Sequence, residues 1–296
     1  MKLVALKNAI VETAKDIQCN HTFAMAAGLS YYFLLSLFPL LIFIAGILAY
    51  IPIPGLFEEI LNTMSRFVPG PAMGTVREIL SSVLTPPATG WISFGLIFTI
   101  WTASSGFAAL IEGLNVAYDV PETRPYWRVR LLALGLAVAV GSCVIVGLAV
   151  SLLGPRFGQI LEEHRHAGPL FAAVWPTIHW VVIVASIVIA VEVLYYMAPN
   201  VKQRFLSAFP GALLAIGAWI GASYVLGIYM REFANYNKTY GAIGGVVALM
   251  LWFYVSATAL LIGAEVNSEL LKATGCILPT KEAPEPKNLN EEVRAA

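Results

Sequence analysis

The sequence predicts an all-α integral membrane protein, a bundle of about six transmembrane helices with both termini in the cytoplasm. Of the 296 residues, 58% are hydrophobic and only 12% are charged, against roughly 25% charged in a typical soluble domain. A soluble fold of this length has too little interior to bury so much apolar side chain, whereas lipid accepts it. The apolar residues are gathered in runs that match the thickness of a bilayer, and the basic residues are divided unevenly between the connections.

Each predicted span is a run of about 20 mainly apolar residues, the length that crosses a hydrocarbon core of roughly 30 Å. Helices are expected because backbone groups in lipid must find their hydrogen bonds within the segment. The runs are approximately 29–51, 91–114, 131–153, 174–197, 211–230 and 241–264. Only about ten residues separate the last two runs, so these should form a tight hairpin.

The N-terminal residues 1–25 are expected to form an interfacial amphipathic helix. Leu3, Leu6, Ile10, Ala14 and Ile17 recur at helical spacing, and Lys7, Glu12 and Lys15 lie opposite them. The first apolar run begins well inside the chain and is followed by IPIPG, which is not a small-residue cleavage site. We therefore expect a retained span and not a signal peptide.

The connections divide the chain further. The long segment from Pro52 to Gly90 is punctuated by prolines, and its apolar residues recur helically in two stretches. This pattern predicts two short helices on the outer surface. Residues 26–270 then form the transmembrane domain, and the tail 271–296 contains few apolar residues and is expected to be largely disordered.

Orientation follows from the distribution of lysine and arginine. Twelve of the 18 basic residues lie on the side that contains both termini. The positive-inside rule therefore places that side in the cytoplasm, and an even number of spans keeps both termini there.

Small residues indicate close helix packing in the fifth span. Gly211, Ala215, Ala218 and Ala222 recur at intervals of three or four, and Gly217 and Gly221 form a GxxxG pair. Such residues let helices approach closely in lipid. Two interpretations stay open: packing within one bundle, or a face that forms a homo-oligomer.

Polar residues at membrane depth mark a candidate site, because ionisable groups inside a span are costly. The three spanning carboxylates all fall toward the cytoplasmic ends of their helices. We predict a cytoplasm-facing polar pocket with a basic rim. The pocket residues are Glu112, Asn115, Glu192, Asn200, Glu265, Asn267, Ser30, Tyr31 and Tyr32, and the rim residues are Arg124, Arg128, Arg130, Lys202 and Arg204.

Three roles for this layer stay open. The carboxylates can bind protons or a cation, or the basic rim can hold an anionic lipid headgroup while apolar faces accept its acyl chains. Alternatively, the glutamates pair with nearby arginines and only fix the inner ends of the helices. Glu192 lies deepest, seven residues before Pro199.

No cofactor or metal motif is evident. His179 has no second histidine at metal spacing on its helix, and His164 and His166 form only a weak HxH pattern. The three cysteines are far apart and form no CxxC pair. Net charge is zero, so no nucleic-acid partner is expected. Membrane lipids are the expected partners.

Several motifs together resemble a known family. They include AAGLSYYFLLSLFPLL near the start, LNVAYDVPETRPYWRVR in the first cytoplasmic loop, and LYYMAPNVK, FPGALLA, YMREFANYNKTYGAIGGVV and LWFYVSATALLIGAEVNSEL in the second half. The chain is similar to the YihY/BrkB family of bacterial inner-membrane proteins, from about Ala24 to Leu270. The resemblance implies a six-helix fold in the cytoplasmic membrane. It implies no settled activity, although members have been called virulence factors or ribonuclease BN.

The sequence favours a transporter or translocase, with a lipid or another amphiphile as its cargo. A non-transporting scaffold for envelope assembly is the alternative. Ribonuclease activity is not expected, since the cytoplasmic loops carry no histidine and no metal cluster is evident. Ser104, Ser105 and Gly106 lack the surroundings of an intramembrane protease, so we predict no enzyme. A continuous cavity would favour transport, and ion-paired glutamates would favour a scaffold.

Overall fold

A computed structural model describes residues 12–48, 56–65, 68, 70–83, 90–163, 169–232 and 236–273. Within those ranges every regular element is helical. Residues 12–19 form a short helical segment. The elements that follow are α2 (Thr22–Leu48), α3 (Leu56–Met64), α4 (Gly70–Val83), α5 (Gly90–Ala117), α6 (Tyr126–Glu163), α7 (Pro169–Met197), a 3₁₀ turn η1 (Phe205–Ser207), α8 (Phe209–Glu232) and α9 (Tyr236–Ala273).

The all-α membrane fold is confirmed. Each predicted apolar run lies largely within one of the long helices α2, α5, α6, α7, α8 and α9, although α6 and α9 extend well beyond theirs. Four stretches of the described residues are long and apolar enough to span a bilayer, and residues 22–37 of α2 form a shorter apolar stretch. The number of spans therefore stays a prediction. Residues 1–11, which carry much of the predicted interfacial helix, and the tail from residue 274 lie outside the described residues.

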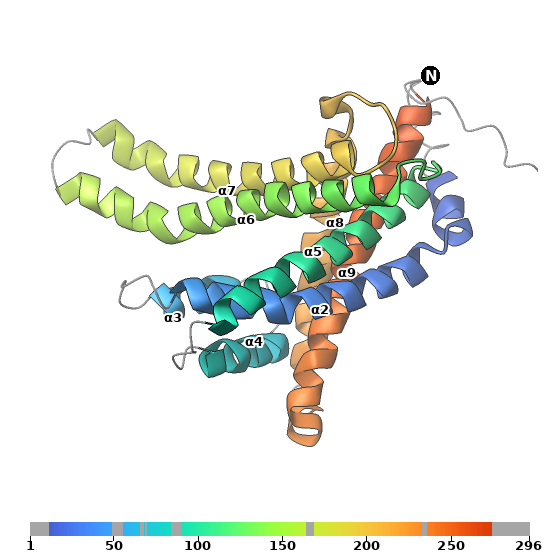
Figure 1. The fold of residues 1–296 in the computed structure, drawn as a ribbon. Coiled ribbons are helices and arrows are strands. Elements are labelled where there is room, and N and C mark those ends of the chain that lie inside the picture. The colour runs from blue at the N-terminus through green and yellow to red at the C-terminus, as the bar shows by residue number, and fades with distance from the viewer. Residues whose placement is uncertain are drawn as a thin grey trace, which may run out of the picture.

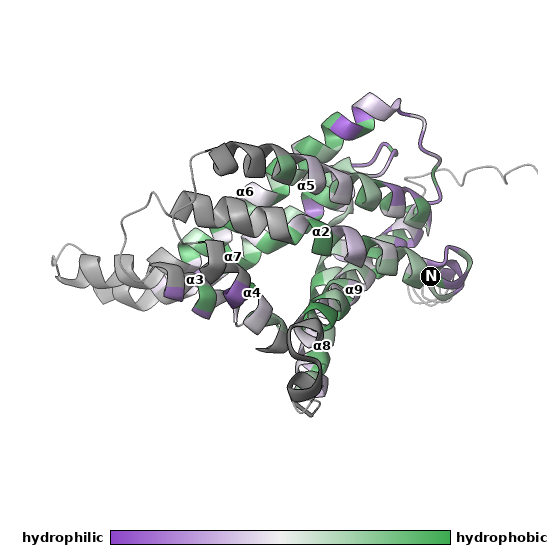
Figure 2. Cartoon of the chain, turned by 60° about the horizontal axis from the view of Figure 1, so that its bottom comes forward, coloured by the Kyte–Doolittle hydropathy of each residue, from purple (hydrophilic) through white to green (hydrophobic). Residues whose placement is uncertain are grey.

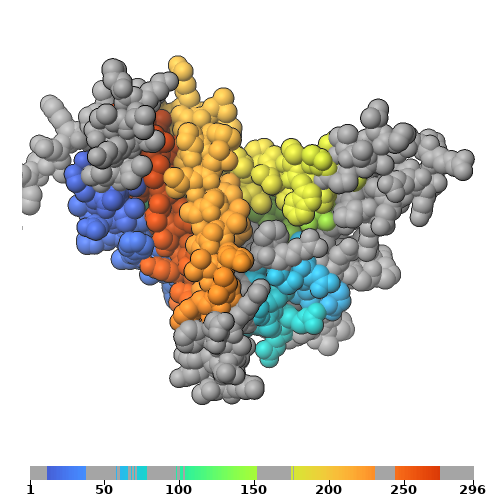
Figure 3. Space-filling view, turned by 180° about the vertical axis from the view of Figure 1, so that it is seen from behind, coloured from blue at the N-terminus to red at the C-terminus, as the bar shows by residue number. Residues whose placement is uncertain are grey.

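The long helices pack as three pairs, α2 with α5, α6 with α7, and α8 with α9. Figure 1 shows the α6–α7 hairpin reaching well beyond the rest of the molecule, while α8 and α9 cross the other pairs steeply. From behind, α8 covers the face between α9 and α7 (Figure 3). Short connections force consecutive helices to pack as antiparallel neighbours, which explains the α6–α7 and α8–α9 pairs.

The two predicted short helices exist as α3 and α4. Leu61 of α3 and Val76 of α4 are buried in a second apolar cluster with Leu34 of α2 and Leu249 of α9. Their apolar faces therefore close the end of the bundle at which α2 ends. This is more than the surface position that the proline-punctuated pattern suggested.

The outward faces of the long helices are apolar. Val138 and Ile145 on α6, Val184 on α7 and Val225 on α8 are all more than half exposed. Figure 2 shows hydrophobic residues along these helices and hydrophilic ones mainly at the loops and the N-terminal segment. Exposed apolar surface of this extent requires a lipid environment.

The small residues of α8 lie in two different environments, one packed against α9 and one exposed. A Cβ added at Gly211 would lie 2.4 Å from Cβ of Asn267, and one added at Gly263 of α9 would lie 2.6 Å from Cβ of Ala215. These glycines let α8 and α9 cross in close contact. By contrast, Gly217 and Gly221 are exposed, and an added Cβ would meet nothing within 4 Å.

Candidate functional site

The polar residues of the bundle gather at one end, which we call the polar end. It comprises residues 12–22, the loop 118–125, the connection 198–208 and the last turns of α9. Hydrogen bonds between residues far apart in sequence join these segments, as in the donation from Asn20 Nδ2 to Glu265 Oε1 at 3.0 Å. The end that the sequence assigns to the cytoplasm therefore forms one connected polar structure.

Two residues with left-handed backbone shape the polar end. His21 has φ of 49° and separates the N-terminal segment from α2, and Asp119 has φ of 52° just after α5. Beyond this turn, the backbone N–H of Val120 donates to the carbonyl of Asn115 at 3.0 Å. Residues other than glycine rarely adopt this conformation, and asparagine, aspartate and histidine do so most readily.

Asn115 joins two connections. Its Nδ2 donates to Glu122 Oε2 at 2.8 Å, and its Oδ1 accepts the backbone N–H of Asn200 at 2.7 Å. Arg124 bonds both oxygens of Glu122 and also donates to the carbonyl of Ala198 at 2.8 Å. The hydrogen bond from Arg124 lowers the pKa of Glu122 to about 2. Arg124 is thus engaged in protein contacts and is poorly placed to hold a headgroup.

Glu265 is buried and bound by neutral donors. Asn20 and the hydroxyl of Thr22 both donate to its Oε1, the latter at 3.1 Å. Only 1% of the residue is exposed. Its carboxyl group therefore holds the turn at residues 20–22 against α9. The sequence offered no signal for this contact, because Asn20 and Thr22 belong to a segment predicted to lie in the membrane interface.

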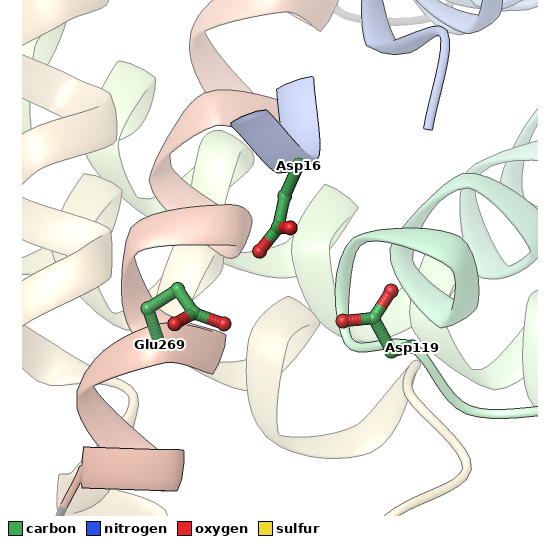
Figure 4. A group of neighbouring side chains, drawn as sticks. All are labelled: Asp16, Asp119 and Glu269. Carbon is green, nitrogen blue, oxygen red and sulfur yellow. The ribbon is translucent and has the colours of Figure 1, made fainter. Parts of the chain in front are cut away.

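Three acidic side chains from distant segments meet nearby (Figure 4): Asp16, Asp119 and Glu269 have oxygens within 4.8 Å of one another. Lys272 Nζ lies 2.6 Å from an oxygen of Asp119 and 2.6 Å from an oxygen of Glu269. Its ammonium group supplies the positive charge that such a cluster needs. Burial, and then the negative charge of Glu269, raise the pKa of Asp16 to about 6.

Glu192 has different surroundings from the other glutamates. It is 2% exposed on α7, and within the described part of the chain neither carboxylate oxygen has a hydrogen-bond partner. Its charge interacts with Tyr118, which follows α5. Asn267 Nδ2 donates to the Tyr118 hydroxyl at 2.8 Å, and the side chain of Gln203 lies beside the same hydroxyl.

The remaining predicted residues lie apart from these groups. Glu112 is exposed. Ser30 is buried, but its hydroxyl donates to the carbonyl of Ala27 at 2.7 Å, and Tyr31 and Tyr32 are 53% and 40% exposed. The contacts of the described residues do not bring all the predicted residues together, because residues next to each other on a helix face different neighbours, and a common pocket stays a prediction.

The predicted rim residues also differ. Arg130 donates to the Ser105 hydroxyl at 3.0 Å and lies over the ring of Trp101 at 4.5 Å, so its guanidinium binds α5. Arg128 in the first turn of α6 and Lys202 and Arg204 in the connection 198–208 are exposed. These three are the exposed members of the predicted rim.

A large apolar cavity of about 550 Å³ lies between the helices. Its walls come chiefly from α6, α7, α8 and α9. They include Val140, Cys143, Gly147, Ile183, Ile187, Ala190, Val191, Ile216, Trp219, Trp252, Phe253 and Leu260. Glu112, Glu192 and Glu265 do not line this cavity. The sequence did not predict it.

Two serine hydroxyls in the cavity wall are bonded within the protein. Ser186 donates to the carbonyl of Ile183 at 2.7 Å, and Ser256 donates to the carbonyl of Trp252 and accepts from Trp219 Nε1 at 2.9 Å. Trp252 Nε1 has no hydrogen-bond partner among the described residues, but nearly all of the wall surface is apolar. Its volume falls in the range of small-ligand sites, and its chemistry suits a hydrocarbon chain.

Fold and site together define an all-α membrane protein with an apolar cavity between its helices and a connected polar end. A family model described as virulence factor BrkB matches residues 13–287. The chain therefore belongs to the BrkB family of membrane proteins, as its motifs indicated.

Among curated proteins, the chain is 38% identical over 247 residues to the "putative ribonuclease-like protein YfkH" of Bacillus subtilis, with 83% of this chain and 89% of that protein covered. It is 27% identical to a UPF0761 membrane protein of Stenotrophomonas maltophilia and 28% identical to one of Xanthomonas oryzae. The match spans 58% of each of these two longer relatives. No solved structure matches the chain.

Proposed function

We propose that this protein is a transporter or translocase of the bacterial inner membrane and that its cargo is a lipid or another amphiphile. In this proposal both termini lie in the cytoplasm. An acyl chain occupies the apolar cavity, and the exposed basic residues of the polar end meet the anionic headgroup.

The cavity is the observation that carries this proposal. An apolar cavity of about 550 Å³ in a membrane protein accepts hydrocarbon, and its nearly uniform apolar wall disfavours a polar solute, which would lose its hydrogen bonds to water there. The cavity also reaches toward the polar end. Val191 in its wall precedes Glu192, and Leu260 in its wall accepts the Tyr195 hydroxyl through its carbonyl.

The headgroup contact rests on Arg128, Lys202 and Arg204. Because anionic headgroups attract basic side chains near the membrane surface, with about 1 kcal/mol per residue, a cluster of three is enough to favour an acidic lipid. Arg124 and Arg130 already bind the protein, and they contribute to the positive potential without leaving their partners.

A scaffold for envelope assembly is the second candidate. It is favoured by the exposed glycines Gly217 and Gly221 on α8, which offer a homo-oligomer face. A scaffold needs no cavity, however, and the described contacts give Glu192 and Glu265 no ion pair of the kind that would only fix helix ends. The name of YfkH raises ribonuclease activity, which we do not propose for this chain.

Native mass spectrometry of the gently purified protein tests the lipid proposal. We expect a specific anionic lipid to remain bound to the wild type. Neutralising Arg128 and Lys202 together should remove the preference for anionic lipid. Ala190→Phe, which fills the cavity from α7, should displace the lipid.

Val184→Phe is the matched control, since Val184 lies on the same helix and is 53% exposed. It should leave the bound lipid unchanged. A lipid-free wild type, or a random lipid mixture that is insensitive to all these changes, would argue for the scaffold. Loss of lipid should also be followed by loss of headgroup translocation in a liposome assay.

A further inference from the structure

We propose that Glu192, Tyr118, Gln203 and Asn267 form an internal binding site for one sodium ion at the polar end of the bundle. The inference concerns groups outside the apolar cavity, and it does not depend on lipid transport.

The first step is the charge of Glu192. Only 2% of the residue is exposed, and within the described ranges no charged side chain interacts with it. An ionised carboxylate held in this way is strongly unfavourable unless a cation compensates for its charge or a proton neutralises it. Glu265 differs, since two neutral donors already bind its oxygen.

The second step is the excess of acceptor oxygens. Both oxygens of Glu192, Oε1 of Gln203 and Oδ1 of Asn267 are buried and have no hydrogen-bond partner among the described residues. The Tyr118 hydroxyl links these residues. Asn267 donates a hydrogen bond to it, the Gln203 side chain lies beside it, and it interacts electrostatically with Glu192. A proton on Glu192 would satisfy only one of these acceptors. A small cation satisfies several at once.

The third step is the backbone. Tyr118 directly follows α5, which ends at Ala117, and Glu192 lies five residues before α7 ends at Met197. The C-terminus of α5 therefore lies at the group, and its partial negative charge favours a cation. Gln203 is held in place because its Nε2 donates to the carbonyl of Tyr195 at 2.6 Å.

The ligand set favours a monovalent hard cation. All candidate ligands are oxygens, which suits alkali and alkaline-earth ions and not soft metals. Only one carboxylate is present among them, so one positive charge neutralises the site and a divalent ion would leave an excess. Carboxyl, amide and hydroxyl oxygens together can replace the water shell of a sodium ion.

Thermal unfolding of the full-length protein in detergent tests this site. Sodium chloride should raise the melting temperature up to a plateau, because an ion that binds only the folded state stabilises that state. Potassium chloride or choline chloride at equal ionic strength should not do so. Glu192→Gln should abolish the saturable shift, and Tyr118→Phe should raise the half-saturating sodium concentration by roughly 10-fold.

Glu112→Gln is the matched control, since Glu112 is exposed on α5, and it should respond to sodium as the wild type does. Binding of radioactive sodium to the wild type and to Tyr118→Phe gives a second measurement if Glu192→Gln does not fold. Equal stabilisation by all three salts would overturn the proposal. So would a stability that depends on pH through Glu192 but not on sodium, which would identify a proton site instead.

Discussion

Two buried glutamates show how the same residue type takes different roles through its partners. Glu265 accepts from Asn20 and Thr22, so its removal is expected to release the N-terminal segment from α9. Glu192 has no partner in the described part of the chain, and the proposed sodium ion would supply one. Depth in the membrane alone does not separate these roles, because both residues are almost fully buried.

Asp16 makes the attachment of the N-terminal segment depend on pH. Its pKa is raised to about 6, first by burial and then by the charge of Glu269, while Lys272 acts in the opposite direction. The folded state therefore binds the proton more tightly than the unfolded state does. Stability from this group is fully present below its ordinary pKa and is lost as pH rises through about 6.

Hydrogen exchange of the amides in residues 12–22 measures this effect. After correction for intrinsic exchange rates, protection should be higher at pH 5 than at pH 8. Asp16→Asn removes the titrating group and should keep the protection high at both values. Glu12→Gln is the control, because the described contact of Glu12 is with the exposed side chain of Lys15. An equal fall in protection in Asp16→Asn would refute the role of Asp16.

The glycines at the α8–α9 crossing give a prediction at the scale of helices. Gly211→Ala would place its Cβ 2.4 Å from Cβ of Asn267 and 2.6 Å from the carbonyl of Gly263. Because backbone cannot move aside as a flexible side chain does, the two helices must separate. We expect the free energy of unfolding to fall by about 1–3 kcal/mol, measured by denaturation in mixed detergent.

Gly217→Ala tests the same substitution on the same helix without the contact. An added Cβ there meets nothing within 4 Å, so stability should stay unchanged or rise slightly, because glycine is a poor helix former. If both variants lost the same stability, the close contact at the crossing would not be the cause, because the Cβ added at Gly217 makes no such contact. A change of oligomeric state in Gly217→Ala alone would instead favour the homo-oligomer face.

The helices were predictable from the sequence and their contacts were not. Length and hydropathy located all the long helices, since both are local properties of the chain. The bond from Asn115 to Asn200 joins residues 85 apart in the sequence, and no spacing rule connects them. For the same reason the sequence did not predict the contacts of Tyr118, Gln203 and Asn20, or that Tyr31 and Tyr32 are exposed.

At the scale of the whole molecule, the polar end fixes where the two ends of the described chain lie. Residues 12–22 and the last turns of α9 are joined there by Asn20 and Glu265. Short helices α3 and α4 close the opposite end. Residues 12 and 273 therefore lie at the same end of the bundle, and in the proposed six-span arrangement the positive-inside rule assigns this end to the cytoplasm.

Labelling of single cysteines with a membrane-impermeant maleimide decides the orientation. Cys19 is exposed at the polar end, and Cys143 and Cys276 can be replaced by serine. Ser65, which is exposed just after α3, can carry a cysteine at the other end. We expect Cys19 to react in inverted vesicles but not in intact spheroplasts, and Ser65→Cys to react in spheroplasts.

Two other labelling results would contradict this expectation in different ways. If Cys19 reacted only in spheroplasts and Ser65→Cys only in inverted vesicles, the bundle would be right and the assigned orientation reversed. The proposed headgroup residues Arg128 and Lys202 would then face the outer side, and lipid movement would have to begin there. If both cysteines reacted from the same side, α3 would not lie across the membrane from the polar end, and the six-span arrangement itself would have to be revised.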